Sequence, residues 1–307
     1  MTQSALRLPL IQAPMFLLSG PEMVIASAKA GIIGSFPTQN SRTTDELEQW
    51  LITITEALRG TESEQLWAIN LVMHPSYPRR DQDLALAIKY KAPIVITALG
   101  SPKDAIAPVH EYGGKVFADV INMDFARKAA AGQVDGLALV CAGAGGHTGF
   151  ISPFAFLKEV RTFFKGEIIL SGAISTGSDV FAAQVLGADY VYVGTRFIAT
   201  HESMAVEDYK QLVVNSNLAD IVTSDAITGV KANWLRGSLA KAGYDPDNMP
   251  GAADIDFAQA GSDSKRWRDI WSAGQGVGNI KQRESIKDVV DQMVEEYSQS
   301  RKQWQGA

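Results

Sequence analysis

The chain has 307 residues, of which 46% are hydrophobic and 20% are charged, so it can bury a large core and is not a disordered protein. Its 28 Lys and Arg residues against 34 Asp and Glu give a formal net charge of −6, which lacks the basic footprint of a nucleic-acid-binding protein. The single cysteine, Cys141, excludes an internal disulfide framework and a cysteine-cluster metal site, and it fits a reducing cytosol.

Membrane and targeting signals are missing from the sequence. The N-terminal residues contain no basic segment followed by an uninterrupted apolar run, which a secretory signal needs. No stretch approaches the roughly 18 to 20 apolar residues of a membrane-spanning helix. We therefore expect a soluble, cytoplasmic protein that binds neither membranes nor nucleic acids.

Short apolar runs rich in Val and Ile recur through the first two thirds of the chain. They are continuous rather than alternating, which is typical of parallel strands that are covered on both faces. These eight predicted strands are residues 9–12, 31–36, 67–72, 93–99, 115–121, 136–142, 167–172 and 190–195.

Amphipathic segments separate the runs and predict helices. They cover residues 44–59, 81–91, 103–112, 123–131, 153–164 and 178–186. Eight strands that each lead towards a helix match the count of a (β/α)8 TIM barrel, an α/β fold. A doubly wound open sheet has the same alternation of elements and is the alternative.

The strand rhythm stops after Thr200. Helical patterns and a turn-rich stretch follow, and a clean amphipathic helix returns near the C-terminus, from Ser285 to Trp304. We predict a barrel made of residues 1–202 and 280–307, with a helical insertion after the eighth strand, residues 203–279, that covers the mouth of the barrel as a substrate lid. A small separate C-terminal domain is the alternative.

A glycine-rich loop, residues 143–149 (GAGGHTG), follows the sixth predicted strand. Thr148 stands where the third glycine of a GxGxxG dinucleotide fingerprint would be, so the loop is not that motif. Its glycines let the backbone approach a flat ligand closely. His147 would then place an imidazole, which titrates near neutral pH, at the carboxyl end of a strand, where TIM barrels carry their chemistry. A flexible loop without function is the alternative.

Small residues follow the seventh and eighth predicted strands, at 171–173 (SGA) and 194–196 (GTR). Backbone N–H groups and helix N-termini at these two strand ends are a common phosphate site of TIM barrels. Small residues that only ease tight turns are the alternative for each stretch. Together the two stretches predict a phosphate-bearing cofactor whose reactive ring lies near His147.

Other catalytic patterns are absent from the sequence. It contains neither HExxH nor a histidine pair four residues apart, so we expect no metal site. The nucleophile elbow GxSxG of serine hydrolases is also missing. Cys141 lies in an apolar run and is expected to be a core residue rather than a nucleophile.

The order of these segments resembles the nitronate monooxygenase family, formerly called the 2-nitropropane dioxygenases. The resemblance rests mainly on AGGHTG at 144–149 and GTRF at 194–197, and it extends from about residue 8 to about residue 280. It is also carried by Ala13-Pro14-Met15, Asn70, Ser171-Gly172 and Ala273-Gly274-Gln275.

The resemblance implies an FMN-dependent TIM barrel oxidoreductase with the flavin at the barrel mouth. By that carry-over, Gly172, Ala173, Gly194 and Thr195 hold the FMN phosphate. His147 takes the place of the family histidine, as general base or as hydrogen-bond donor to the nitro group. The residues that the resemblance assigns to the cofactor are Ala13, Pro14, Met15, Asn70, Gly145, Gly146, Ser171, Gly172, Ala173, Gly194, Thr195 and Gln275.

The chain departs from the family pattern at three positions. Gly143 stands where many relatives have Glu, Asp119 where some have a cofactor-contacting Lys, and Ala173 where a second glycine is usual. Backbone N–H donors do not depend on the methyl group of Ala173. An aspartate near an anionic reduced flavin disfavours that anion unless the carboxyl is protonated or paired.

The function implied by the resemblance is the oxidation of alkyl nitronates (nitroalkanes) by O2 to a carbonyl compound and nitrite. A small-molecule substrate and O2 are the expected partners, and a homodimer is a possible oligomeric state. Trp234, Trp267 and Trp271 of the lid would shut out water. The same superfamily contains enoyl-ACP reductases and NADH:quinone reductases, so an NADH-dependent FMN reductase acting on an enoyl thioester or a quinone is the alternative. A barrel without FMN, such as a phosphosugar isomerase or a binding protein, is a third possibility.

Overall fold

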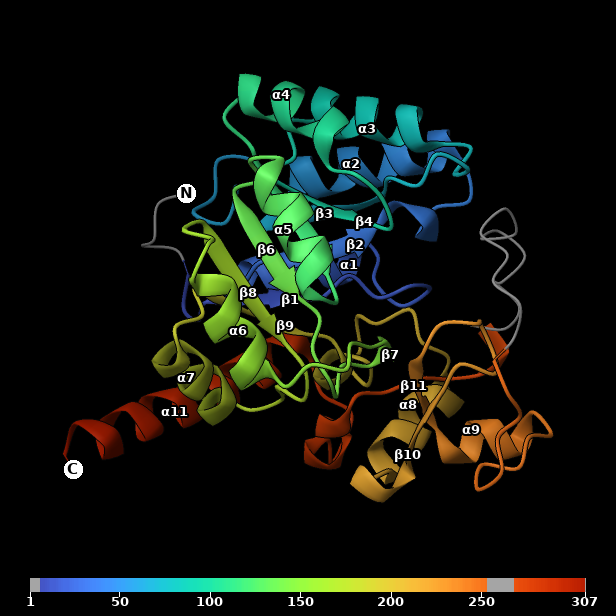
Figure 1. Ribbon diagram of the computed structural model, residues 1–307. Coiled ribbons are helices and arrows are strands. Elements are labelled where there is room, and N and C mark those ends of the chain that lie inside the picture. The colour runs from blue at the N-terminus through green and yellow to red at the C-terminus, as the bar shows by residue number, and fades with distance from the viewer. Residues whose placement is uncertain (1–5, 253–267, 307) are drawn as a thin grey trace.

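The eight predicted strands form one parallel sheet that closes into a barrel (Figure 1). The computed structural model describes residues 6–252 and 268–306. The strands follow one another around the barrel in the order β1-β9-β8-β6-β5-β4-β3-β2. Their bounds are β1 (Leu10–Gln12), β2 (Gly34–Pro37), β3 (Trp67–Val72), β4 (Ile94–Ala98), β5 (Lys115–Val120), β6 (Gly136–Leu139), β8 (Glu167–Ser171) and β9 (Tyr190–Val193).

The barrel is closed between β1 and the residue that precedes β2. Ile11 and Ile33 form a parallel bridge, in which the Ile33 N–H donates to the Leu10 carbonyl at 3.0 Å and the Gln12 N–H donates to the Ile33 carbonyl at 2.8 Å. The predicted TIM barrel is therefore confirmed, and the open-sheet alternative is wrong.

Eight helices follow the eight barrel strands and cover the sheet from outside. They are α1 (Pro21–Lys29), α2 (Thr44–Leu58), α3 (Arg80–Lys89), α4 (Lys103–Glu111), α5 (Met123–Ala131), α6 (Pro153–Arg161), α7 (Gly177–Leu186) and α11 (Ile286–Gln305). The sequence patterns predicted all of them except α1. A short 3₁₀ helix, η2 (Thr38–Asn40), follows β2.

Burial explains why the strands and helices have these sequences. All six residues of β3 are buried, as the continuous apolar run predicted for a strand covered on both faces. In α2 the buried residues recur every three or four positions, at Leu47, Leu51, Ile54 and Leu58, so that one face of the helix meets the barrel. The Thr43 hydroxyl caps this helix by accepting a hydrogen bond from the Glu46 N–H at 3.1 Å.

In its described residues, the insertion after the eighth barrel strand contains the predicted helices and also two strands, which the prediction of a helical insertion did not include. A three-stranded antiparallel sheet in the order β10-β11-β7 joins the insertion to the loop that follows β6. Figure 1 shows β7 reaching from the barrel towards β11. The elements are β7 (Gly146–His147), α8 (Glu207–Asn215), η4 (Leu218–Asp220), β10 (Ile221–Ser224), β11 (Ala232–Leu235), α9 (Arg236–Lys241) and η6 (Gln275–Asn279).

The tryptophans of the insertion pack within it. Trp234 is fully buried in a small cluster with Ile227 and Leu239, and the Trp271 ring stacks on Tyr209 with ring centroids 5.0 Å apart. Trp267 lies outside the described residues. Whether the insertion acts as a lid stays a prediction.

The C-terminal helix α11 returns to the outside of the barrel and packs on α7 and α1. Tyr297 of α11 meets the Phe181 ring of α7 edge to face at 5.7 Å, and Asp291 pairs with Arg7 at 2.7 Å. Among the helices of the described part of the chain, none is long and apolar enough to cross a membrane.

Candidate functional site

The predicted site residues lie where the barrel strands end. Ala13, Pro14 and Met15 directly follow β1, and Gly194 directly follows the neighbouring strand β9. A Cβ atom built on Gly194 would lie 3.5 Å from both the Ala13 Cβ and the Met15 Sδ, so these two strand ends are in contact. The Ala13 N–H donates to the Val193 carbonyl at 2.9 Å and fixes their register.

The loop that carries His147 is held by the insertion. Gly146 and His147 form β7 and pair with Asn233 and Ala232 of β11. The Thr148 N–H donates to the Lys231 carbonyl at 3.1 Å, which extends this pairing. His147 therefore sits on a strand rather than on an unsupported loop, and its side chain is exposed.

Three segments that are distant in sequence meet at Gly145, Thr195 and Gly274. The Gly274 N–H donates to the Thr195 Oγ1 at 2.8 Å. A Cβ atom on Gly145 would lie 2.7 Å from the Gly274 nitrogen and 2.9 Å from that hydroxyl. Since real Cβ atoms do not approach backbone this closely, glycine at position 145 allows the three segments to touch.

Gln275, which the resemblance assigns to the cofactor, lies against the same loop. Its N–H donates to the Gly143 carbonyl at 2.9 Å. A Cβ atom on Gly143 would lie 2.9 Å from the Gln275 Oε1 and 3.3 Å from the Ala173 Cβ. Gly143 also has a φ of +90°, a conformation that a side chain disfavours. The Glu found in many relatives at this position would need a different loop here.

The predicted phosphate donors are available after β8 and β9. Within residues 6–252 and 268–306, the backbone N–H groups of Gly172, Ala173, Gly194 and Thr195 donate to no acceptor. Gly172 has a φ of +112°, and a Cβ there would lie 2.6 Å from the Ala142 carbonyl oxygen. These four donors can therefore receive an anion from outside the chain.

The helix N-termini contribute less to this site than the sequence predicted. The N–H groups of Ser175 and Thr176 both donate to the Asp179 Oδ2 at 2.9 Å, and the Gly177 N–H donates to Glu296 at 2.8 Å. These carboxylates already cap α7. The element after β9 is a single 3₁₀ turn, η3 (Thr195–Phe197), rather than an α-helix.

A polar cluster forms the floor of the barrel mouth. Asn70 of β3 donates from Nδ2 to the Ile96 carbonyl at 3.3 Å and to the Asp119 Oδ2 of β5 at 3.5 Å. Within the described chain, the Asp119 Oδ1 and the Tyr192 hydroxyl of β9 are buried and have no hydrogen-bond partner. The sequence pattern missed Tyr192, because it lies in an apolar strand and resembles a core residue; its polar tip near a strand end was the available signal.

Burial changes the acidity of this cluster. Burial raises the pKa of the Asp119 carboxyl to about 7, and the hydrogen bond from Asn70 opposes that rise only in part. Burial, together with the charge of Asp119, raises the pKa of the Tyr192 hydroxyl well above its usual value.

Cys141 and Ser171 lie in the barrel wall beside this site. Cys141 is buried, its Sγ donates to the Leu139 carbonyl at 3.3 Å, and burial raises the pKa of its thiol to about 12. The thiol is therefore inert, which confirms the expectation of a core residue. Ser171 is the buried last residue of β8.

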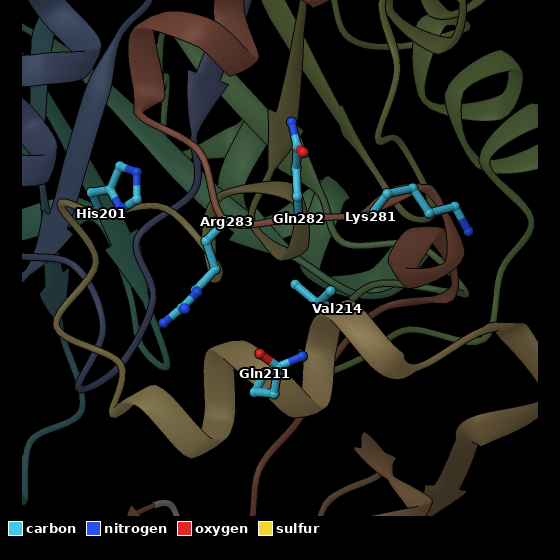
Figure 2. A pocket seen from close by; sticks show the side chains of 6 residues that line it. All are labelled: His201, Gln211, Val214, Lys281, Gln282 and Arg283. Carbon is cyan, nitrogen blue, oxygen red and sulfur yellow. The ribbon is translucent and has the colours of Figure 1, made fainter.

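A separate cavity of about 440 Å³ lies between α8 and the segment that precedes α11 (Figure 2). Figure 2 shows Gln211 and Val214 of α8 on one side and the segment 281–283 on the other. The Arg283 guanidinium forms an ion pair with Glu207. None of the predicted site residues lines this cavity; its lining consists of His201, Gln211, Val214, Lys281, Gln282 and Arg283.

Comparison with known proteins gives one family match. A family model described as nitronate monooxygenase matches residues 60–296, which run from the residues before β3 into α11. The chain is similar to a nitronate monooxygenase from Paraburkholderia phytofirmans, with 27% identity over 278 residues, 78% of this chain and 76% of that protein.

Two further relatives widen the comparison. A (3aS,4S,5R,7aS)-5-hydroxy-7a-methyl-1-oxo-octahydro-1H-indene-4-carboxyl-CoA dehydrogenase from Rhodococcus jostii is 27% identical over 244 residues, 79% of this chain and 67% of that protein. The solved structure of a nitroalkane oxidase from Streptomyces ansochromogenes superposes with a TM-score of 0.81 at 22% identity, over 98% of this chain and 99% of that one. The latter similarity extends to the whole barrel, including the strands that precede the family match.

Proposed function

Because the chain belongs to the nitronate monooxygenase family and is an oxidoreductase, we propose that it uses FMN to oxidise alkyl nitronates or nitroalkanes with O2. The products are a carbonyl compound and nitrite. The observation that carries the proposal is a set of backbone N–H donors after β8 and β9 that have no acceptor among the described residues, next to the strand that presents His147.

The residues at the strand ends fit FMN. Its phosphate would accept from the N–H groups of Gly172, Ala173, Gly194 and Thr195, which have no acceptor within the described residues. Its ring would find polar partners on the floor of the mouth, where two buried oxygens have no hydrogen-bond partner in the described part of the chain. The remaining residues proposed to contact the cofactor are Ala13, Pro14, Met15, Asn70, Gly145, Gly146, Ser171 and Gln275.

FMN, when bound, supplies the redox chemistry with the substrate and O2. The protein binds and orients the cofactor and the substrate, and its side chains transfer protons. His147 takes the α-proton of a neutral nitroalkane on a ring nitrogen, or donates a hydrogen bond to a nitro oxygen when the substrate arrives as the nitronate. Pairing of β7 with β11 holds the backbone of His147, which supports an imidazole oriented for this transfer. The insertion, residues 203–279, excludes water from the mouth.

Substitution of His147 tests this assignment. We expect His147→Asn to keep the flavin and to lose about 100-fold or more of its turnover with neutral nitroalkanes, because proton abstraction then lacks its base. Turnover of the preformed nitronate should fall much less. His201→Asn is the matched control, because His201 is also exposed and lies outside the strand ends. Unchanged nitroalkane turnover in a His147→Asn protein that retains FMN would remove the base role.

A second candidate function is an NADH-dependent FMN reductase that acts on an enoyl thioester or a quinone. The relative from Rhodococcus jostii, named as a carboxyl-CoA dehydrogenase, favours a thioester as the substrate of this alternative. The two functions differ in whether NADH reduces the flavin, so anaerobic addition of NADH separates them.

A further inference from the structure

Three polar side chains from three barrel strands converge beneath the mouth. Asn70 comes from β3, Asp119 from β5 and Tyr192 from β9. Asn70 is within 3.5 Å of Asp119, and the charge of Asp119 acts on the Tyr192 hydroxyl. Tyr192 is only 7% exposed. In the part of the chain that the structure describes, the Asp119 Oδ1 and the Tyr192 hydroxyl are buried without a partner.

An ionised carboxylate is poorly supported at this place. The neighbouring strands β4 and β6 have the sequences IVITA and GLAL, which contain no charged residue. Asn70 offers one long hydrogen bond to Asp119. The nearby titratable group is the Tyr192 hydroxyl, whose pKa the charge of Asp119 helps to raise. A buried carboxylate without a cation or several donors is costly, whereas a neutral carboxylic acid carries an O–H donor that a ligand can use.

We propose that Asp119 is a hydrogen-bond donor to the bound flavin: its carboxyl stays protonated on the barrel floor and donates to an acceptor atom of the flavin ring, beside the Tyr192 hydroxyl. This inference rests on the proposed function, since it takes FMN as the ligand of the mouth. If Asp119 has this role, the affinity of the protein for FMN depends on whether the Asp119 carboxyl carries its proton.

Proton linkage gives the sign of the effect. In the free protein the pKa of Asp119 is about 7. A flat ligand over the mouth removes the remaining water and raises that pKa further, so binding takes up a proton above neutral pH. FMN affinity should therefore fall as pH rises above about 7, by up to about tenfold per pH unit.

FMN binding to the apoprotein measures this linkage directly. Quenching of FMN fluorescence gives the dissociation constant between about pH 6.5 and pH 9 for the wild type and for Asp119→Asn, whose amide keeps a donor but cannot ionise. We expect the FMN affinity of the wild type to fall with rising pH more steeply than that of Asp119→Asn. The ratio of the two dissociation constants is compared because titration of the FMN phosphate affects both proteins and cancels in the ratio. Tyr192→Phe should bind FMN more weakly than the wild type, but its FMN affinity should change with pH as that of the wild type does.

Asp83→Asn is the matched control. Asp83 is also a carboxyl whose pKa is raised by burial, but it lies on α3, where Tyr77 and Arg79 contact it. The FMN affinity of this variant should depend on pH as that of the wild type does. Should Asp119→Asn fail to fold, calorimetry of FMN binding to the wild-type apoprotein in two buffers with different ionisation enthalpies still counts protons, and we expect uptake of nearly one proton at about pH 8.

The outcomes separate this inference from the proposed function. Parallel pH slopes in the wild type and Asp119→Asn, or binding without proton uptake, would overturn the role of Asp119 and leave the flavin assignment standing. Failure of the wild type to bind FMN at any pH would overturn both.

Discussion

The side chain of Asn233 donates a hydrogen bond from Nδ2 to the backbone carbonyl of Ala144 at 2.7 Å. This contact joins β11 of the insertion to the glycine-rich loop, two residues before β7. Asn233 is 1% exposed, and its Oδ1 accepts from the Thr223 hydroxyl of β10. One amide therefore connects both strands of the insertion to the loop that carries His147.

Removal of this amide should loosen the His147 loop. Asn233→Ala leaves the buried carbonyl of Ala144 unpaired, which costs about 1–3 kcal/mol of stability, whereas the hydroxyl of the exposed Thr223 can bond to water instead. We expect a lower melting temperature and a lower kcat, with FMN affinity less affected, because the predicted phosphate donors lie on other strand ends. Asn215→Ala, at an exposed amide of α8, is the control and should change none of these quantities. A normal kcat in Asn233→Ala would show that the loop holds His147 without the insertion.

The contact of Gly145 with Gly274 should not tolerate a methyl group. In Gly145→Ala the new Cβ would meet the Gly274 nitrogen at 2.7 Å. We expect a loss of about 1–3 kcal/mol in the free energy of unfolding, as in other overpacked sites, together with weaker FMN binding. Chemical denaturation and FMN titration measure the two effects. Gly251→Ala is the control, since no atom of the described residues lies within 4 Å of its Cβ position. Equal stability of the two variants would mean that the segments separate at little cost.

The ion pair between Arg196 and Glu284 should stabilise the end of β9. The atoms lie 2.9 Å apart, and the two side chains are 5% and 14% exposed. Arg196→Met leaves Glu284 as a largely buried, unpaired charge, which costs about 3–5 kcal/mol. Thermal denaturation should show a large drop in melting temperature, and the double variant Arg196→Met, Glu284→Gln should recover part of it. No recovery would mean that the guanidinium acts by packing alone.

The stability of the apoprotein should depend on the protonation of Asp119. Its pKa rises from 3.8 to about 7 on folding, so the native state binds the proton more tightly than the unfolded state. The resulting stability is complete below about pH 4 and is lost as pH rises through about 7. Asp119→Asn should therefore have a higher melting temperature than the wild type at about pH 8 and lose this advantage near about pH 4. A difference between the two proteins that is independent of pH would place the carboxyl in water.

The sequence patterns predicted the barrel because its strands are short and fully covered, as β3 shows. They missed α1, which starts without a side-chain cap and has only nine residues. They also missed β10 and β11, because each strand has only four residues, which give too little periodicity, and β7, the second partner of β11, is more than seventy residues away in the chain.

Local sequence patterns likewise predict one part of the candidate site and not the other. Residues at strand ends, such as His147, Gly172 and Thr195, could be found because strand ends follow from the local pattern. The contacts between them depend on long-range packing. The Thr195 hydroxyl accepts from Gly274, 79 positions along the chain, and no local pattern predicts such a pair.

The visible absorption spectrum of the purified protein under anaerobic conditions tests the central claim most directly. Our account predicts flavin bands, in the protein as purified or after reconstitution with FMN, that stay unchanged when NADH is added and change when an alkyl nitronate follows. Prompt bleaching by NADH would contradict the nitronate assignment and favour the reductase. The absence of flavin bands after reconstitution would contradict the cofactor itself.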